Sequence, residues 1–440
     1  MIAFRNFLNI FSIVELRRKL FFTLGVLVVY RIGNIIPIVG VDVEGFVKFM
    51  ANKASIASGI FSYIDMFSGG SLAKCTLFAL GIQPYIMASI AMQMLTLSLP
   101  MLEELAKEGE YGRKIINQYT RYLALGIAFM HSIGYSIFVE RYELALFPGW
   151  TFRLTFIFLV TVGAMFTMWL GEQISLHGLG NGSSMLIFAG IVSRFPNDIF
   201  TTVVSIKAGY FGLATVLILV AIVLLITSSI VFMEKGERRI PVQYTRRVVG
   251  NRVFGGQGAF IPFRINNAGI MPVIYSNAVI NIPMFISSFF ATRWILFKYI
   301  SEALQPPAAL YNVLDFVLII GFSFLYLTFQ FKPEELAENM RKSGGFIPGI
   351  RPGKKTAEFF NYLLTRIGLV GAIYLGILVL LPNFFTSILL LPRLSILSGT
   401  GILIIVGVSL ELAAQMEAYL LENRYKGFLS VGRFKARGAS

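Results

Sequence analysis

The chain has 440 residues, 56% of them hydrophobic, which exceeds the roughly 45–50% apolar share of soluble domains. One cysteine and two histidines exclude an intrachain disulfide and a metal site of the zinc-finger kind. The formal net charge of +15 leaves nucleic acid, anionic lipid and a protein partner open as sources of attraction. Its apolar runs of about 20 residues are too long for barrel strands, so we expect an all-α membrane protein.

The N-terminal residues contain Arg5 but no short apolar core followed by a small-residue cleavage site, so we expect no removable signal peptide. Hydropathy then predicts ten membrane spans. They cover residues 20–36, 76–99, 122–139, 152–170, 182–195, 213–233, 268–290, 310–329, 363–381 and 401–420. The fifth span is short and the tenth contains Glu411, so we expect both to line something other than lipid.

Charge is distributed unequally between the segments that connect these spans. If the N-terminus is cytoplasmic, most of the 38 Lys and Arg residues fall in cytoplasmic segments, and both termini lie on that side. The two largest such segments are the basic islands 234–264 and 332–366. Both are longer than topology alone requires. They predict docking of a large partner, with attraction to anionic lipid headgroups as the alternative.

The polar segment 196–210 divides the chain into an N-terminal half, residues 1–200, and a C-terminal half, residues 201–440. Each half has five spans, and because five is odd, the second half must be inverted relative to the first. The pattern G-I-x-P-x-I occurs in span two at residues 81–86 and again in span seven at residues 269–274. Chance is the alternative explanation of this repeat. Inverted repeats place the functional path between the halves.

No arrangement of residues predicts catalysis, and we expect no metal or cofactor. The sequence GIRPGKKT at 349–356 has the wrong spacing for a phosphate-binding loop. Four ionisable residues lie in or near spans: Arg31 and Asp315 near outer ends, Glu172 in a short loop, and Glu411 within span ten. Glu411 is explained either by a structural hydrogen bond or by a role in proton transfer.

The segment 60–72 is too short and polar to cross a bilayer, and Gly69 and Gly70 interrupt any helix. It predicts either a re-entrant piece that lines a cavity or an external loop, and we favour the first. Branched aliphatic residues also recur at helical spacing, as Ile82 with Ile86 in span two. Isoleucine in a membrane helix normally faces lipid or packs against neighbours, so the importance of this pattern depends on what the spans surround.

Seven motifs resemble one protein family in order and spacing. They are FSGG at 67–70, FALGI at 78–82 with PYI at 84–86, KEGE at 107–110, QYTRY at 118–122, WLGEQI at 169–174, GNG at 180–182 and IPGIRPG at 347–353. From about Leu16 to the last span, the chain is similar to the SecY family of protein-conducting channel subunits. This resemblance implies two inverted halves that form a clamshell around an hourglass-shaped pore.

The resemblance also assigns sites inside the membrane. The pore ring it implies consists of Ile82, Ile86, Ser183, Ile187, Ile274 and Ile404, where Ser183 departs from the usual apolar residue. The plug it implies includes Ile60, Phe61, Tyr63, Ile64, Met66, Phe67, Ser68, Gly69 and Gly70. Spans two and seven would flank a lateral gate with the polar residues Gln93, Asn266 and Asn267, for which water-facing caps are the alternative.

In the basic islands the resemblance implies docking of a motor ATPase or of the ribosome. The residues concerned are Arg238, Arg239, Arg246, Arg247, Arg252, Arg341, Lys342, Arg351, Lys354 and Lys355. The expected partners are the motor SecA, the ribosome, small single-span subunits of the SecE and SecG kinds, preproteins with signal peptides, and anionic lipids. The expected location is the bacterial cytoplasmic membrane.

Two other classes of function compete with a polypeptide channel. A secondary transporter could share the inverted-repeat architecture and use Glu411 as its coupling residue. A membrane-embedded protease would need a catalytic constellation, for which His177 near Glu172 is the only hint.

Overall fold

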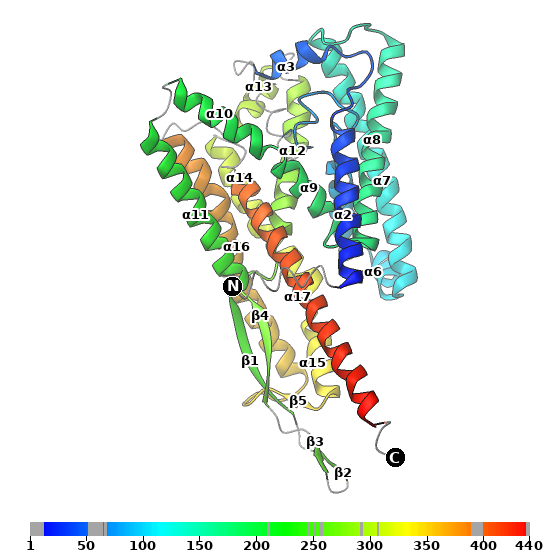
Figure 1. Ribbon diagram of the computed structural model, residues 1–440, viewed down its shortest axis with the longest axis vertical. Helices are drawn as coiled ribbons and strands as arrows, with labels where there is room; N and C mark the ends of the chain where they lie inside the picture. Colours follow the sequence, from blue (N-terminus) through cyan, green and yellow to red (C-terminus); the bar gives the residue numbers. More distant parts are fainter. Residues whose placement is uncertain are drawn as a thin grey trace. The chain divides into compact units, whose positions relative to one another are not determined.

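The computed structural model describes residues 13–51, 65, 68–208, 212–244, 247–249, 252–254, 258–290, 294–305, 308–388 and 399–436. Helices dominate this part of the chain (Figure 1). A helix lies at each of the ten expected spans. These helices are α2 (Val14–Gly33), α5 (Gln83–Ser98), α7 (Glu110–Arg141), α8 (Trp150–His177), α9 (Gly182–Val192), α11 (Leu213–Lys235), α12 (Met271–Phe290), α14 (Ala309–Gln330), α16 (Lys354–Ile388) and α17 (Gly399–Ala436).

Within the described ranges, six helices are long and apolar enough to cross a membrane: α7, α8, α11, α14, α16 and α17. A seventh candidate is α5 together with α6 (Pro100–Lys107), which meet at a bend of 99°. The helix α9 has 11 residues, about half the length that a bilayer requires. The short fifth span of the sequence is therefore a short helix.

Two expected positions were wrong, and the connection between spans five and six has a structure that was not expected. Span two begins as a helix at Gln83 rather than at residue 76, because the preceding residues form successive turns and Gly81 has a φ of +54°. Glu172 lies inside α8 and not in a loop, since α8 continues to His177. The connection 196–210 is largely the helix α10 (Phe195–Lys207), which has Asp198 in its first turn and Lys207 in its last, as the helix dipole favours.

Two further short helices are α3 (Val43–Ala51) and α13 (Ile295–Ala303). Small residues allow the long helices to pack closely against one another. In α7, Ala124, Ala128 and Ser132 recur at every fourth position and are buried, and Ser132 lies within 3.1 Å of the hydroxyl of Thr161 in α8. Small and hydroxyl residues are typical of closely packed membrane helices.

The described chain divides into two compact units. The first unit consists of residues 1–204, 285–301 and 404–440, and the second of residues 205–284 and 302–403. In the first unit α7 packs on α5 and α8, and α8 packs on α9. In the second unit α14 packs on α16. The relation of the two sequence halves by inversion stays a prediction.

A small sheet is added to the helices in the second unit (Figure 1). Strand β1 (Glu237–Tyr244) pairs antiparallel with β4 (Gly258–Arg264), and β5 (Gly345–Phe346) pairs with the other edge of β1. The strands β2 (Arg247–Val249) and β3 (Arg252–Phe254) form a separate antiparallel pair between β1 and β4 in the chain. The island 234–264 is therefore mostly a β-hairpin, which hydropathy did not indicate.

Candidate functional site

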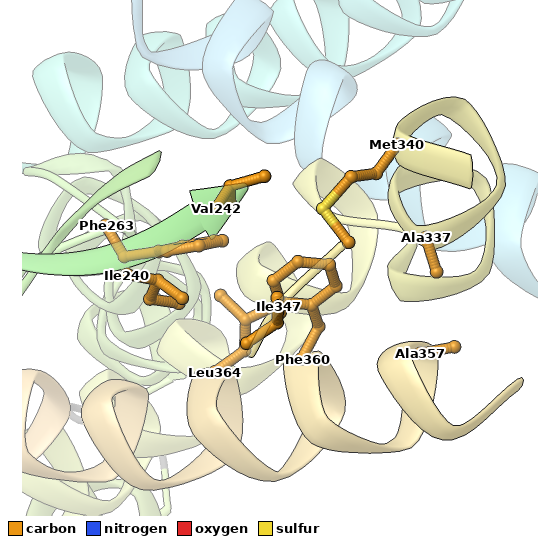
Figure 2. Close-up of a cluster of buried hydrophobic side chains, with 9 residues drawn as sticks. All are labelled: Ile240, Val242, Phe263, Ala337, Met340, Ile347, Ala357, Phe360 and Leu364. Carbon is orange, nitrogen blue, oxygen red and sulfur yellow. The ribbon is translucent and has the colours of Figure 1, made fainter. Parts of the chain in front are cut away.

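The two basic islands fold together around one apolar core (Figure 2). The core unites β1, β4, the helix α15 (Pro333–Lys342), the residue after β5 and the start of α16. Its buried members are Ile240, Val242, Phe263, Ala337, Met340, Ile347, Ala357, Phe360 and Leu364. We call residues 236–264 and 332–364 the loop module. Because both islands contribute to one core, they form a single structural element.

Local sequence explains how the loop module forms. Along β1, Ile240 and Val242 alternate with exposed residues, so one face of the strand is apolar. The ring of Phe263 in β4 lies 5.8 Å from that of Phe360 in α16, which fixes the hairpin to the helix. Complete burial of such a side chain stabilises a fold by roughly 1.5–3 kcal/mol. The module therefore has a core of its own, independent of the basic residues that surround it.

The described docking residues lie on the surface of the loop module. Exposed side chains are those of Arg238, Arg239, Arg341, Lys342, Arg351, Lys354 and Lys355. Arg247 and Arg252 lie on the short strands β2 and β3, and Arg246 lies outside the described residues. Several loop-module carboxylates pair with these cations at the surface, as Glu338 does with Arg341 at 2.8 Å. That hydrogen bond lowers the pKa of Glu338 below its ordinary value.

Arg351 occupies a tight turn between β5 and α16. Gly349 and Gly353 on either side have φ values of +84° and +101°, a region that favours glycine. The backbone carbonyl of Arg351 accepts a hydrogen bond of 3.0 Å from the hydroxyl of Thr356 in α16. The turn thus holds the backbone in place while the guanidinium remains exposed.

Of the plug residues, the structure describes Ser68, Gly69 and Gly70. The others, Ile60, Phe61, Tyr63, Ile64, Met66 and Phe67, lie outside the described residues. Ser68 and Gly69 are buried within the first unit, as are Asp65, Leu72 and Cys75, whereas Gly70 is partly exposed. Tyr135 of α7 donates a hydrogen bond of 3.0 Å to the carbonyl of Leu72. We call Asp65 and residues 68–75, with their contacts on α2, α7 and α9, the plug seat.

Five of the six expected ring residues belong to the first unit, and Ile274 belongs to the second. The isoleucines Ile82, Ile86, Ile187, Ile274 and Ile404 are all buried. Ile82 lies beside Gly171 of α8, and Leu186 of α9 borders the same glycine. The structure thus brings the start of α5 and the helix α9 to one place on α8, whereas the complete ring stays a prediction.

Ser183 has a structural reason to differ from the apolar ring residues. It lies in the first turn of α9, where the side chain of Asn181 caps the helix. The carboxamide oxygen of Asn181 accepts hydrogen bonds from the backbone nitrogen of Ser183 at 3.1 Å and from its hydroxyl at 2.6 Å. The hydroxyl is therefore engaged in the N-terminal cap of α9.

Two of the residues expected at the lateral gate, Gln93 and Asn266, make local contacts. Gln93 donates a hydrogen bond of 3.2 Å to Ser89 on the preceding turn of α5. Asn266 donates to Glu234 at 3.0 Å and to the carbonyl of Gly269 at 3.2 Å, and it closes the turn before α12. A gate formed by Gln93, Asn266 and Asn267 stays a prediction.

The remaining ionisable candidates have varied surroundings. Asp315 is buried and accepts a hydrogen bond of 2.5 Å from Ser276, whereas Glu411 is exposed on α17. Glu172 pairs with Arg121 at 2.8 Å, and the ring of His177 packs edge-on against Phe22. In the part of the chain that the structure describes, no group of three or more His, Cys, Asp or Glu residues is placed to hold a metal ion.

Arg194 is a site residue that sequence motifs did not indicate. It follows the short helix α9 and pairs with the buried carboxylate of Asp65. Two features of the sequence could have drawn attention to it: a charged residue directly after an apolar span, and an aspartate in the plug segment. Nothing in the sequence indicated that these two positions are in contact, because they are 129 residues apart.

A family model described as SecY matches residues 76–413. The chain belongs to the SecY family. It is 40% identical to the protein translocase subunit SecY of Thermus thermophilus over 441 residues, which cover 98% of this chain and 99% of the relative. It is also 40% identical to the protein translocase subunit SecY of Escherichia coli over 430 residues, which cover 96% of each chain.

Solved structures agree on the fold. One described as a protein-conducting channel has a TM-score of 0.66 at 18% identity and covers 91% of this chain and 92% of its own. Another, described as Sec61 in a canine ribosome–channel complex, has a TM-score of 0.61 with the same identity and coverage. The all-α fold with ten helices is that of SecY and Sec61 channels.

These comparisons confirm the family, the fold class and the function expected from the motifs. The chain is a multi-pass membrane protein and a subunit of a protein-translocating channel. The family is one of translocation-channel subunits and not of known enzymes, which favours the channel over the protease and the secondary transporter.

Proposed function

We propose that this protein forms a gated pore in a bacterial cytoplasmic membrane, with both termini in the cytoplasm, through which unfolded secretory polypeptides pass. The observation that carries the proposal is the joint fold of the two basic islands into one loop module. Its exposed arginines and lysines form a large cationic surface around a folded apolar core. A channel that recognises no substrate sequence needs such a surface for the partner that supplies the driving force.

The pore would be closed by a ring of apolar side chains between two inverted halves, residues 1–200 and 201–440. Its members would be Ile82, Ile86, Ser183, Ile187, Ile274 and Ile404. A constriction of branched aliphatic groups excludes ions by dewetting and presents no fixed hydrogen-bonding pattern. Indifference to sequence suits an unfolded polypeptide. The burial of the five isoleucines supports this role.

The segment 60–72 would act as the plug that seals the empty pore. Burial of Asp65 and Ser68 inside the first unit supports a re-entrant segment over an external loop. In a solved SecY structure that this chain resembles, the plug domain is described as stabilising the closed state of the translocation channel and maintaining a membrane seal. The same role here requires that the plug leaves its seat when a polypeptide enters.

Lateral release would occur where α5 and α12 part. A segment of about 20 apolar residues could then move from the pore into lipid. Gln93, Asn266 and Asn267 would lie along this seam, where polar side chains stabilise closure by hydrogen bonds without preventing separation.

The loop module would bind a motor ATPase of the SecA kind or the ribosome. Arginine suits both partners, because its guanidinium binds the phosphates of RNA and the carboxylates of an acidic protein surface. The ribosome–channel complex of a Sec61 relative supports the second partner. Arg351, held on its turn, would make the central contact. Single-span subunits of the SecE and SecG kinds and anionic lipids would complete the assembly.

The test of this proposal is a site-specific crosslink. A photoreactive residue replaces Ile187 or Ile274, and a secretory precursor is arrested halfway across reconstituted vesicles. We expect adducts with the precursor at both positions. The matched control is Leu224, which is exposed on α11 and should react with lipid. If vesicles that translocate the precursor give adducts at Leu224 and at neither isoleucine, the pore assignment is wrong.

A further inference from the structure

The plug seat contains an ion pair whose carboxylate is buried and whose guanidinium is partly buried. Asp65 accepts a charge-assisted hydrogen bond from Arg194, and their side chains are 3% and 22% exposed. The other carboxylate oxygen accepts hydrogen bonds from the hydroxyl of Ser68 at 3.0 Å and from the backbone nitrogen of Ala73 at 2.9 Å. Three donors thus surround one carboxylate, and only Arg194 carries a charge to balance it.

The backbone next to this pair lies directly on α9. Gly69 has a φ of +71°, and a methyl group added to it would lie 2.8 Å from the Cα atom of Gly190. Arg31 of α2 donates a hydrogen bond of 3.3 Å to the carbonyl of Gly69. The turn therefore contacts both α2 and α9, and it is bound by one arginine from α2 and one that follows α9.

The two arginines act on different groups. Arg31 binds a backbone carbonyl, which any plug sequence would present, whereas Arg194 binds the side chain of Asp65. Removal of one partner from a buried ion pair leaves an uncompensated charge, which is strongly unfavourable. Asp65 can therefore leave Arg194 only when water reaches its carboxylate. Opening of the proposed pore would meet this condition.

Arg194 is also connected to the expected pore ring. It lies in the turn directly after α9, the helix that carries Ser183 and Ile187 near its start. The spacing of Ile187 and Gly190 places both on one face of α9, and Gly190 contacts the plug turn. A displacement of α9 that widens the ring would therefore also move Arg194 relative to Asp65.

We infer that the ion pair between Asp65 and Arg194 latches the plug to α9 and sets how readily the empty channel opens. Arg194 is thus a positioning residue for the plug. This inference rests on the proposed role of the segment 60–72 as the plug.

The test measures the leak of small anions through vesicles that contain the assembled channel and no precursor. Arg194→Met removes the charge and keeps an apolar stem, and we expect the leak to rise about tenfold, as loss of a hydrogen bond to a charged group allows. Arg194→Lys keeps the charge and should restore most of the seal. The matched control is Arg153→Met, which breaks the ion pair of 2.5 Å between Arg153 and Glu140 in the same unit.

A second variant tests the pair from its other side. Asp65→Asn should leak by a similar factor, and the double variant Asp65→Asn with Arg194→Met should leak no more than the leakier single variant, because both changes remove one interaction. Translocation of an intact precursor by each variant shows that it is folded. If Arg194→Met leaks no more than Arg153→Met, or if the two leaks add in the double variant, the latch is wrong.

Deletion of residues 60–67 separates this inference from the proposed plug. If the deletion raises the leak and Arg194→Met does not, the plug is real and the latch fails. If neither change raises the leak, the proposed plug role fails as well.

Discussion

The loop module and the plug seat use the same charged residue types in opposite surroundings. In the loop module, Arg341 and Glu338 pair at the surface, with side chains 59% and 40% exposed, above a core that contains neither of them. In the plug seat, Asp65 is buried and its charge is balanced by Arg194. An exposed pair contributes little to stability and leaves its charges available to a partner. A buried pair restrains a conformation, because its separation requires water.

The loop module should depend on its apolar core and not on its charges. Phe360→Ala removes a fully buried ring, which costs about 3–5 kcal/mol in comparable cores. We expect the module to become sensitive to limited proteolysis and motor-driven translocation to be lost. Tyr362→Ala removes an exposed ring from the same helix and should change neither. Equal resistance of the two variants to protease would mean that the core does not support the module.

The plug seat should depend on close backbone contact. Gly69→Ala places a Cβ atom against Gly190 and forces a left-handed backbone conformation on a non-glycine residue, at a cost on the order of 1–3 kcal/mol. We expect the resting anion leak to rise, with precursor translocation preserved. Gly126→Ala, in α7, is the control, since a Cβ atom there meets no neighbour within 4 Å. A sealed Gly69→Ala channel would show that this contact does not hold the plug.

The exposed charges of the loop module should affect binding without affecting folding. We expect Arg351→Glu to slow motor-dependent translocation by about tenfold at low salt, through loss of electrostatic steering, with thermal stability unchanged. Lys207→Glu, which reverses an exposed charge at the end of α10, is the matched control. The measurement is the rate of precursor import at several motor concentrations. A loss that is equal for both variants would remove Arg351 from the docking surface.

The sequence predicted local features of the molecule and missed those that depend on contacts between distant residues. Hydropathy located the ten helices that lie at the expected spans, because an apolar run of sufficient length is a local property. It missed α10 and the hairpin of β1 and β4, whose charged residues resemble a loop. It also could not join the islands 234–264 and 332–366, since their common core depends on contacts between Phe263 and Phe360 that are distant in sequence.

Among the candidate sites, motifs indicate residues within a short run of sequence, such as the turn around Arg351, whose role in docking stays a prediction. The partner of Asp65 was not predictable in this way. Arg194 lies on another element, and only the fold brings the two side chains together. The two residues are 129 positions apart, so no local motif contains both.

The smallest effect is expected at the exposed pair of Glu338 and Arg341. The hydrogen bond from Arg341 lowers the pKa of Glu338. The contribution of this pair to the free energy of unfolding is therefore fully present above the ordinary carboxyl pKa of 4.5, and it is lost as the pH falls through the lowered pKa. We expect Glu338→Gln to leave thermal stability at neutral pH almost unchanged, because solvent screens the pair. By contrast, Asp65→Asn should alter the resting leak under the same conditions. If Glu338→Gln destabilised the loop module as strongly as Phe360→Ala does, its surface pairs and not its core would hold it together.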